Sequence, residues 1–336
     1  MTDNEQVLEV LDACEQRRMA RRSFLLSSGT LAAAVGSGML GACSGGNNNG
    51  GNNDGTGVVP PPPTPTPPPT ATTPDQDILN FALNLEYLEA QFYSFAAFGT
   101  SLPNDLLGGT GRPGAPIGGR QVAFTDPVVA QHAREIAIDE RQHVAFLRSA
   151  LGGSAVAQPD LDISAAGAFS SVARAAGLIT ANQTFDPYAN DENFLLGAFI
   201  FEDVGVTAYK GASPLITNKT FLEAAAGILA AEAYHAGLIR TVLYGKGLQT
   251  PSLRTSTTKI SDARDSLDGG PIADDDQGIE QVGTMSNIVP TDANGLAYSR
   301  RASDVLNIVF LTSAAASQGG FFPTGVNGNI RLSSAD

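Results

Sequence analysis

The chain has little of several things that define common protein classes. It contains no Trp, only 2 Cys and only 3 His among 336 residues. Two cysteines are too few for a disulfide-rich scaffold or for a zinc site built from Cys. Lys and Arg number 20 against 34 Asp and Glu, a net charge of −14, which argues against nucleic acid or an anionic membrane surface as a partner. No apolar run reaches the roughly 20 residues of a transmembrane helix, so a membrane contact would need another device.

The N-terminal segment carries such a device. Arg21 and Arg22 precede Ser-Phe-Leu and a mild apolar run over 25–40, which resembles a twin-arginine (Tat) export signal. The run ends in Leu-Gly-Ala-Cys at Cys43, which resembles the lipobox of bacterial lipoproteins. We therefore predict a Tat-type signal peptide over 1–42 and a periplasmic or cell-envelope protein that touches the membrane only through a lipid on Cys43. The alternative is an ordinary secretory signal cleaved near Ala42.

A tether is predicted to follow the signal. Residues 43–74 are rich in Gly and Asn and then in Pro. The first composition is typical of a flexible coil and the second of a stiff polyproline II spacer. Neither can bury apolar surface, so we expect 43–74 to be disordered and to hold a folded domain away from its anchor.

The whole chain is 42% hydrophobic, which supports a real core beyond the tether. Apolar positions recur at three and four residues in four long segments. These predicted helices cover 78–98, 126–151, 191–212 and 220–245, with a shorter one at 163–176. Thr220 and Glu223 suggest a capping box for the fourth. The sequence thus predicts an all-α four-helix bundle over 75–247. Residues 248–336 are predicted to be a loop-rich extension, with one helical segment at 303–311, that packs on the bundle.

Two of the three histidines stand in the same local pattern. Glu140 precedes His143 by three residues in the second helix, and Glu232 precedes His235 by three in the fourth. Residues three apart share one face of a helix, so each Glu and His can bind one metal centre. A single Glu-x-x-His is weak support for a metal site, but its repetition in two helices is strong support.

The first and third helices repeat a second pattern. Glu86 is followed by Tyr93 and Glu202 by Tyr209, each after seven residues, or two helical turns. The bundle therefore consists of one helix pair used twice, which predicts a pseudo-two-fold site between the pairs.

Three further residues adjoin this pattern. Arg148 and Arg240 each follow a patterned histidine by five residues. They would either bind the ligand carboxylates or extend along the surface to solvent. Glu89 lies three residues after Glu86 and is an alternative to it as a ligand.

The flanking residues place these groups in the core. Ile136 and Leu147 flank the second-helix pattern, and Phe199 precedes Glu202 by three. Four carboxylates in an apolar core repel one another and lose hydration, so they must either bind protons or face cations. Two divalent metals balance four carboxylate charges. Carboxylates with one His per metal suit iron first and manganese next, and zinc is also compatible. The alternative is an inward hydrogen-bonded network without metal.

Two segments resemble the ferritin-like superfamily, in the branch of the plant desiccation-related proteins. They are Asn-Phe-Ala-Leu-Asn-Leu-Glu-Tyr-Leu-Glu-Ala-Gln-Phe-Tyr at 80–93 and Gly-Gly-Phe-Phe-Pro at 319–323. The resemblance covers about 76–325. A Glu from each of two helices and Glu-x-x-His from the other two is the arrangement of di-iron and di-manganese carboxylate proteins. The resemblance implies terminal ligands at Glu86 and Glu202, bridging ligands at Glu140 and Glu232, and one metal on each of His143 and His235, with Tyr93 and Tyr209 behind them.

The resemblance specifies the fold and ligands better than the reaction. We expect a di-metal protein that reacts with a small oxidant, oxygen or peroxide, during oxidative or desiccation stress, with ferroxidase-like or peroxide-scavenging chemistry. The alternative is a non-catalytic protective protein whose metals brace the bundle. A homodimer is compatible with either.

Overall fold

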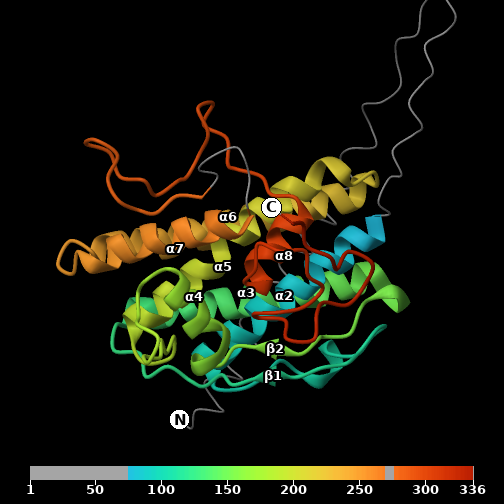
Figure 1. The fold of residues 1–336 in the computed structure, drawn as a ribbon. Coiled ribbons are helices and arrows are strands. Elements are labelled where there is room, and N and C mark those ends of the chain that lie inside the picture. The colour runs from blue at the N-terminus through green and yellow to red at the C-terminus, as the bar shows by residue number, and fades with distance from the viewer. Residues whose placement is uncertain (1–74, 269–275, 336) are drawn as a thin grey trace, which may run out of the picture. The chain divides into compact units, whose positions relative to one another are not determined.

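The computed structural model describes residues 75–268 and 276–335 (Figure 1). The predicted signal peptide over 1–42 with its arginine pair, the lipidation site at Cys43 and the tether over 43–74 all lie outside the described residues. Within the described ranges, no helix combines the length and apolar character that crossing a membrane requires.

Four long helices form the bundle. They are α2 (Asp75–Phe98), α3 (Pro127–Leu151), α5 (Asp191–Ala212) and α6 (Lys219–Lys246). Helix α2 packs mainly on α3, and α5 packs mainly on α6 (Figure 1). The predicted all-α class is confirmed. Two short strands, β1 (Pro116–Ile117) and β2 (Leu161–Asp162), pair in parallel with Pro116 opposite Leu161, and the short helix α4 (Ser170–Ala175) follows them.

The helix starts follow local capping chemistry. The Asp126 side chain accepts a hydrogen bond from the Val128 N–H, and Pro127 occupies the first helical turn. Helix α6 begins one residue before the predicted capping box, because the Asn218 side chain accepts from the N–H groups of Thr220 and Phe221. Asn is as good an N-cap as Ser or Thr, and because Asn218 precedes Thr220 along the chain, it caps the helix in place of Thr220.

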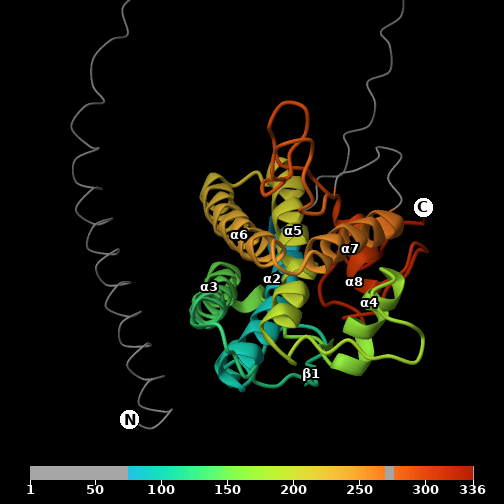
Figure 2. The ribbon, with the colours of Figure 1, turned by 90° about the vertical axis from the view of Figure 1, so that its left-hand side faces the viewer.

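The four helices differ in how they are buried. In α2, 19 of 24 residues are buried, and in α5 17 of 22, whereas α3 buries 10 of 25 and α6 only 8 of 28. Figure 2 shows why: α3 and α6 lie on one side of α2 and α5, and α4, α7 (Ser252–Asp268) and α8 (Ala302–Phe310) lie on the other. A helix that is apolar on all sides needs cover on all sides. The central pair α2 and α5 receives that cover from outside the bundle.

The C-terminal extension supplies much of it. It contains two helices, α7 (Ser252–Asp268) and α8 (Ala302–Phe310), both packed on α5. The expectation of a single helical segment in 248–336 is therefore wrong. Helix α7 buries a regular stripe that includes Leu253, Thr257, Ile260 and Arg264. Half of that stripe is polar, so a search for apolar periodicity does not detect it.

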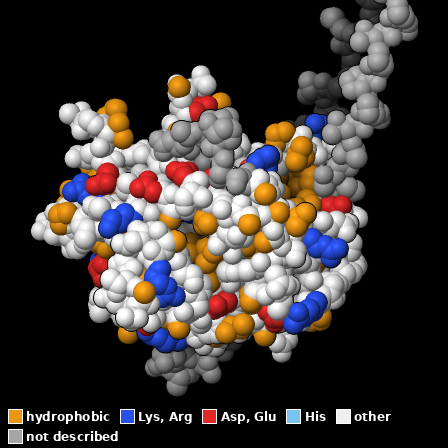
Figure 3. Space-filling view, viewed as in Figure 1, with side chains coloured by type: hydrophobic (Ala, Val, Ile, Leu, Met, Phe, Trp, Pro, Cys, Tyr) orange, Lys and Arg blue, Asp and Glu red, His pale blue; other side chains and the backbone are white. Residues whose placement is uncertain are grey.

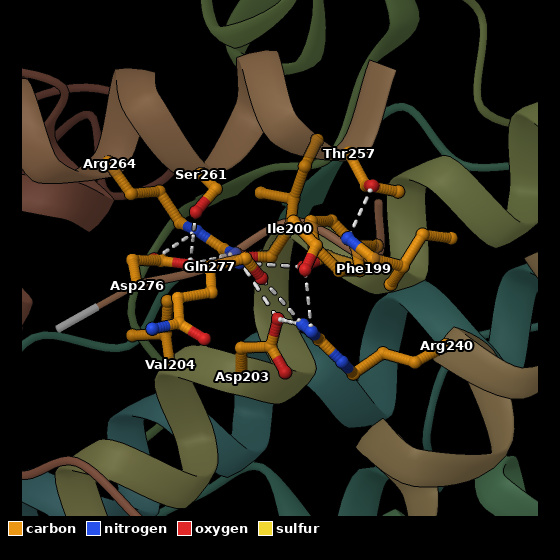
Figure 4. A network of polar contacts seen from close by, with 12 residues as sticks. Phe199, Ile200, Asp203, Val204, Arg240, Thr257, Ser261, Arg264, Asp276 and Gln277 are labelled. Atoms are coloured by element: carbon orange, nitrogen blue, oxygen red, sulfur yellow. Dashed lines mark hydrogen bonds and ion pairs between the residues drawn. The ribbon is translucent and has the colours of Figure 1, made fainter. Parts of the chain in front are cut away.

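Buried ion pairs attach this extension to the bundle. Asp203 of α5 accepts from Arg240 Nη1 of α6 at 2.8 Å and from Arg264 Nη2 of α7 at 3.3 Å (Figure 4). Arg264 Nη2 also donates to Asp276 Oδ1 at 2.6 Å, and Asp276 Oδ2 accepts from Arg300 Nη2 at 3.1 Å. All three guanidinium groups are at least 97% buried. Buried charges are tolerated when each is paired, so this network holds α7 at a defined position on α5 and α6.

The described surface mixes both signs of charge. On the face in Figure 3, basic and acidic side chains are scattered among polar and apolar ones, and those that are visible form no continuous basic patch.

Candidate metal centre

The structure brings the six predicted ligands together in the middle of the bundle. Each of the four helices contributes: Glu86 from α2, Glu140 and His143 from α3, Glu202 from α5, and Glu232 and His235 from α6. The four carboxylates are at most 1% exposed, and the histidines 9% and 4%. Their ligand atoms form two groups with a spread of at most 4.8 Å. The first group holds Glu86, Glu140, His143 and Glu232, and the second holds Glu140, Glu202 and His235.

His143 stands at the centre of the first group. Its Nδ1 lies 3.2 Å from Glu86 Oε2, 3.4 Å from Glu140 Oε2 and 3.3 Å from Glu232 Oε1. Ligands about 2.1 Å from one ion are separated from each other by roughly 3.0–3.4 Å, as tetrahedral or octahedral geometry requires. One imidazole nitrogen can donate to only one of three oxygens. The spacing therefore suits a shared cation better than a set of hydrogen bonds.

His235 organises the second group. Its Nδ1 is 3.0 Å from Glu140 Oε1 and 3.8 Å from Glu202 Oε2. Its other ring nitrogen, Nε2, lies 3.4 Å from Asp139 Oδ2. A carboxylate behind a histidine holds the proton on the far nitrogen and leaves the near one free for a metal. Asp139 is a site residue that the helical spacing does not reveal, because its partner is on another helix.

Two buried tyrosines hold the outer oxygens of two carboxylates. Tyr93 of α2 donates to Glu202 Oε1 of α5, and Tyr209 of α5 donates to Glu86 Oε1 of α2. The seven-residue spacing puts each Glu and Tyr on one face, as expected, but the bonds cross between helices. They cross because α2 and α5 run antiparallel, with Glu86 beside Tyr209 and Tyr93 beside Glu202. Each tyrosine leaves one oxygen of its carboxylate facing the cluster.

The cluster contains most of the buried polar atoms that lack a hydrogen bond in the described structure. Eight such atoms belong to the six side chains. Glu140 and Glu232 have both oxygens unpartnered, whereas Glu86 and Glu202 have only Oε2 unpartnered. Buried polar atoms without partners are costly and rare. Eight that converge on one point are the observation that best fits a bound pair of cations.

Burial raises the pKa of three of the four carboxylates. Desolvation raises the pKa of Glu86 to about 8, and it raises the pKa values of Glu202 and Glu232 above the usual range. Glu140 differs because it lies between both histidines. Burial opposes its ionisation, but the attraction of the nearby His143 and His235 outweighs it and lowers the Glu140 pKa.

The pKa values of both histidines are raised, whereas burial alone would lower them. Burial disfavours their charge, yet the charges of Glu86 and Glu140 raise the pKa of His143. The nearby carboxylates of Asp139 and Glu140 raise the pKa of His235 to about 12 against the same opposition. When metal is absent, the raised pKa values of three carboxylates and both histidines keep protons at the cluster. Metal ions compete for the same ligand atoms and would replace these protons.

The remaining predicted residues lie outside the cluster. Arg148 donates to Tyr87 Oη at 2.7 Å and to the Gly108 carbonyl, and Arg240 belongs to the buried network around Asp203. Neither donates to a ligand carboxylate: Arg240 is buried, so it does not extend to solvent, and Arg148 is half-buried. Glu89 is buried but is not part of either group, so Glu86 faces the cluster in its place.

Comparisons with known proteins agree with this architecture. The family profile described as ferritin-like domain matches residues 74–245. The desiccation-related protein PCC13-62 of Craterostigma plantagineum is 33% identical over 270 residues, which cover 76% of this chain and 83% of that protein. The ferritin-like catalase Nec2 of Nesocodon mauritianus is 30% identical over 271 residues, covering 76% and 84% respectively. No solved structure matches the chain.

Proposed function

This chain belongs to the ferritin-like domain family, in the branch of the desiccation-related proteins, and we propose that it is an exported di-metal carboxylate protein that reacts with peroxide or oxygen. The observation that carries the proposal is the convergence of eight unpartnered buried ligand atoms from four helices on one point. The name of the Nesocodon relative, a ferritin-like catalase, supports peroxide as the oxidant.

The chain's own residues would divide the ligand roles by their free oxygens. Glu140 and Glu232 offer two oxygens each, which a carboxylate needs to bridge two ions. Glu86 and Glu202 offer one each and would be terminal, with the second oxygen fixed by a tyrosine. Asp139 would orient the imidazole of His235. Oxygen ligands with one histidine per ion suit iron or manganese.

A pair of such ions supplies one-electron and dioxygen chemistry that protein side chains lack. Peroxide disproportionation needs no other reactant: one hydrogen peroxide loses two electrons and two protons to become dioxygen, and a second gains them to become two waters. Reaction with oxygen would need an electron donor, either ferrous iron or a small organic molecule. The protein's contribution is to hold the ligands, to exclude bulk water by burial and to keep Tyr93 and Tyr209 on the carboxylates.

Export is part of the proposal and rests on sequence alone. The Arg21–Arg22 pair and the lipobox at Cys43 support delivery through the Tat route to the periplasm or cell envelope, with a lipid anchor. The Tat route carries folded proteins, which suits a bundle whose metals are inserted before export.

One experiment tests the reaction and its location in the cluster. The full-length protein is loaded with Fe(II) or Mn(II), its metal content is measured, and an oxygen electrode follows the addition of peroxide or, separately, of air-saturated buffer. Evolution of oxygen from peroxide supports catalase-like chemistry, and consumption of oxygen supports an oxidase. Glu140→Ala should abolish either activity, whereas Glu135→Ala, an exposed acid on the same helix, should not. A protein with two bound metals and neither activity would be the structural alternative.

A further inference from the structure

A small cavity lies on the side of the metal centre that the extension covers. Its volume is about 20 Å³, and its walls come from α2, α5, α8 and the turn at Phe321. The lining includes Leu88, Val204 and Val309, and Glu89 is its one titratable side chain. This is more space than the roughly 10–15 Å³ that one water molecule needs, and a mainly apolar lining favours apolar guests.

The cavity adjoins the metal centre at a glycine. Gly205 lines the cavity, and a Cβ at this position would lie 2.5 Å from Glu232 Oε2 and 3.4 Å from Glu89 Oε1. The bridging-type carboxylate Glu232 therefore lies directly behind the cavity wall, and only the missing side chain of Gly205 leaves room for it. Glycine is unfavourable in the interior of a helix such as α5, so its presence calls for a local reason. Room for the Glu232 carboxylate is that reason.

Glu89 lines the cavity and is 6% exposed. The other nine lining residues are apolar or glycine. A pocket of this size and polarity suits a neutral diatomic molecule much better than a charged or strongly hydrated one.

We infer that this cavity is the dioxygen pocket of the metal centre and that at Gly205 only the backbone of α5 separates the two. The inference rests on the proposed function, since dioxygen is the product of peroxide disproportionation and the reactant of an oxidase. The walls of the pocket come partly from α8, so the extension has a role at the metal centre as well as in covering α5. Dioxygen would pass between α2, α5 and α8 and reach the metals past Glu232, on the side away from α3 and α6.

The test uses nitric oxide, an apolar diatomic that binds ferrous iron with a visible and EPR signal and needs no turnover. Its association with the anaerobic Fe(II)-loaded protein is followed by stopped flow, after the iron content of each variant is measured. Val309→Ile adds one methyl group to the cavity wall. It should slow association about tenfold, a barrier that overpacking by one methyl group can supply. Val309→Ala widens the same wall and should give at least the wild-type rate.

The matched control is Val305→Ile, the same substitution one turn earlier on α8, at a buried position outside the cavity lining. It should leave the association rate unchanged. Equal rates in Val309→Ile and wild type, with equal iron, would overturn the pocket whatever the oxygen electrode shows. Slow association in Val309→Ile together with no reaction of peroxide or oxygen would support the pocket and refute the proposed function. A protein that binds neither iron nor manganese would refute both.

Discussion

Removing the metals should reverse the way in which stability depends on pH. In the metal-free protein, Glu86 has its pKa raised from 4.5 to about 8, chiefly because it is buried. The folded state therefore keeps a proton that the unfolded chain releases near pH 4.5. The stability that this proton confers is complete below the unfolded pKa and is lost as pH rises through about 8.

The size of this pH-dependent change in stability can be worked out from Glu86 alone. Between pH 5.5 and 7.5 the unfolded carboxyl is ionised and the folded one is not, so stability falls by about 1.4 kcal/mol per pH unit, or about 3 kcal/mol over the window. A bundle of this length loses roughly 2–4 °C in Tm per kcal/mol, which gives about 6–12 °C. Glu202 and Glu232 have pKa values raised in the same direction, so this is a lower bound.

The histidines steepen the upper half of the window. The pKa of His235 is raised from 6.5 to about 12, and its contribution is lost as pH rises from about 6.5. Glu140 has a lowered pKa, so its contribution is present above about pH 4.5 and lost only below it. It does not oppose the trend between pH 5.5 and 7.5.

Bound metal changes the sign. Ions hold the carboxylates ionised and the imidazoles neutral, so protons compete with metal and stability falls on acidification. The assay is a set of thermal melts of chelated and Mn(II)-loaded protein at pH 5.5, 6.5 and 7.5. In the chelated protein, Glu86→Gln should flatten the slope by about one proton, whereas Glu135→Gln on the exposed face should not. Parallel slopes for the two forms would refute a shared buried site.

Four other changes probe single contacts. Glu140→Ala should reduce metal content at both histidines, because its oxygens face both; elemental analysis showing loss of one equivalent alone would contradict this. Tyr93→Phe should keep the metals but destabilise the chelated protein by about 1–3 kcal/mol in urea melts, since a buried carboxylate oxygen loses its donor. Arg264→Met should cost about 3–5 kcal/mol by leaving Asp276 without its closest partner, and a loss below about 1 kcal/mol would argue against the buried network. Cys43→Ser should move the protein from the membrane to the soluble exported fraction, and continued membrane association would refute lipidation.

The ligand set could be predicted from the sequence because its logic is local. Glu140 and His143 share a helix face by spacing alone, and so do Glu232 and His235. The flanking apolar residues then indicate that these faces point inward. Nothing about the partner helix is needed for this step, and the structure brings all six side chains together.

Contacts between helices could not be predicted in the same way. The crossed bonds of Tyr93 and Tyr209 depend on the antiparallel register of α2 and α5, which spacing within one helix does not encode. Apolar periodicity does not detect helix α7 for a related reason. Its buried stripe includes Thr257 and Arg264, whose burial is tolerable only because other segments supply their partners.

The extension and the metal centre are therefore parts of one structure. A bundle of α2, α3, α5 and α6 alone would leave the outer faces of α2 and α5 in water, although these two helices are apolar nearly all round. Helices α7 and α8 pack on α5, and α8 also closes the cavity that Gly205 lines. The wall of that cavity therefore joins residues of α2 and α8 that lie more than 200 positions apart in the chain. A change at Val309, which lines the cavity, should be felt at the metals, while an equally conservative change on the solvent face of α3 should not.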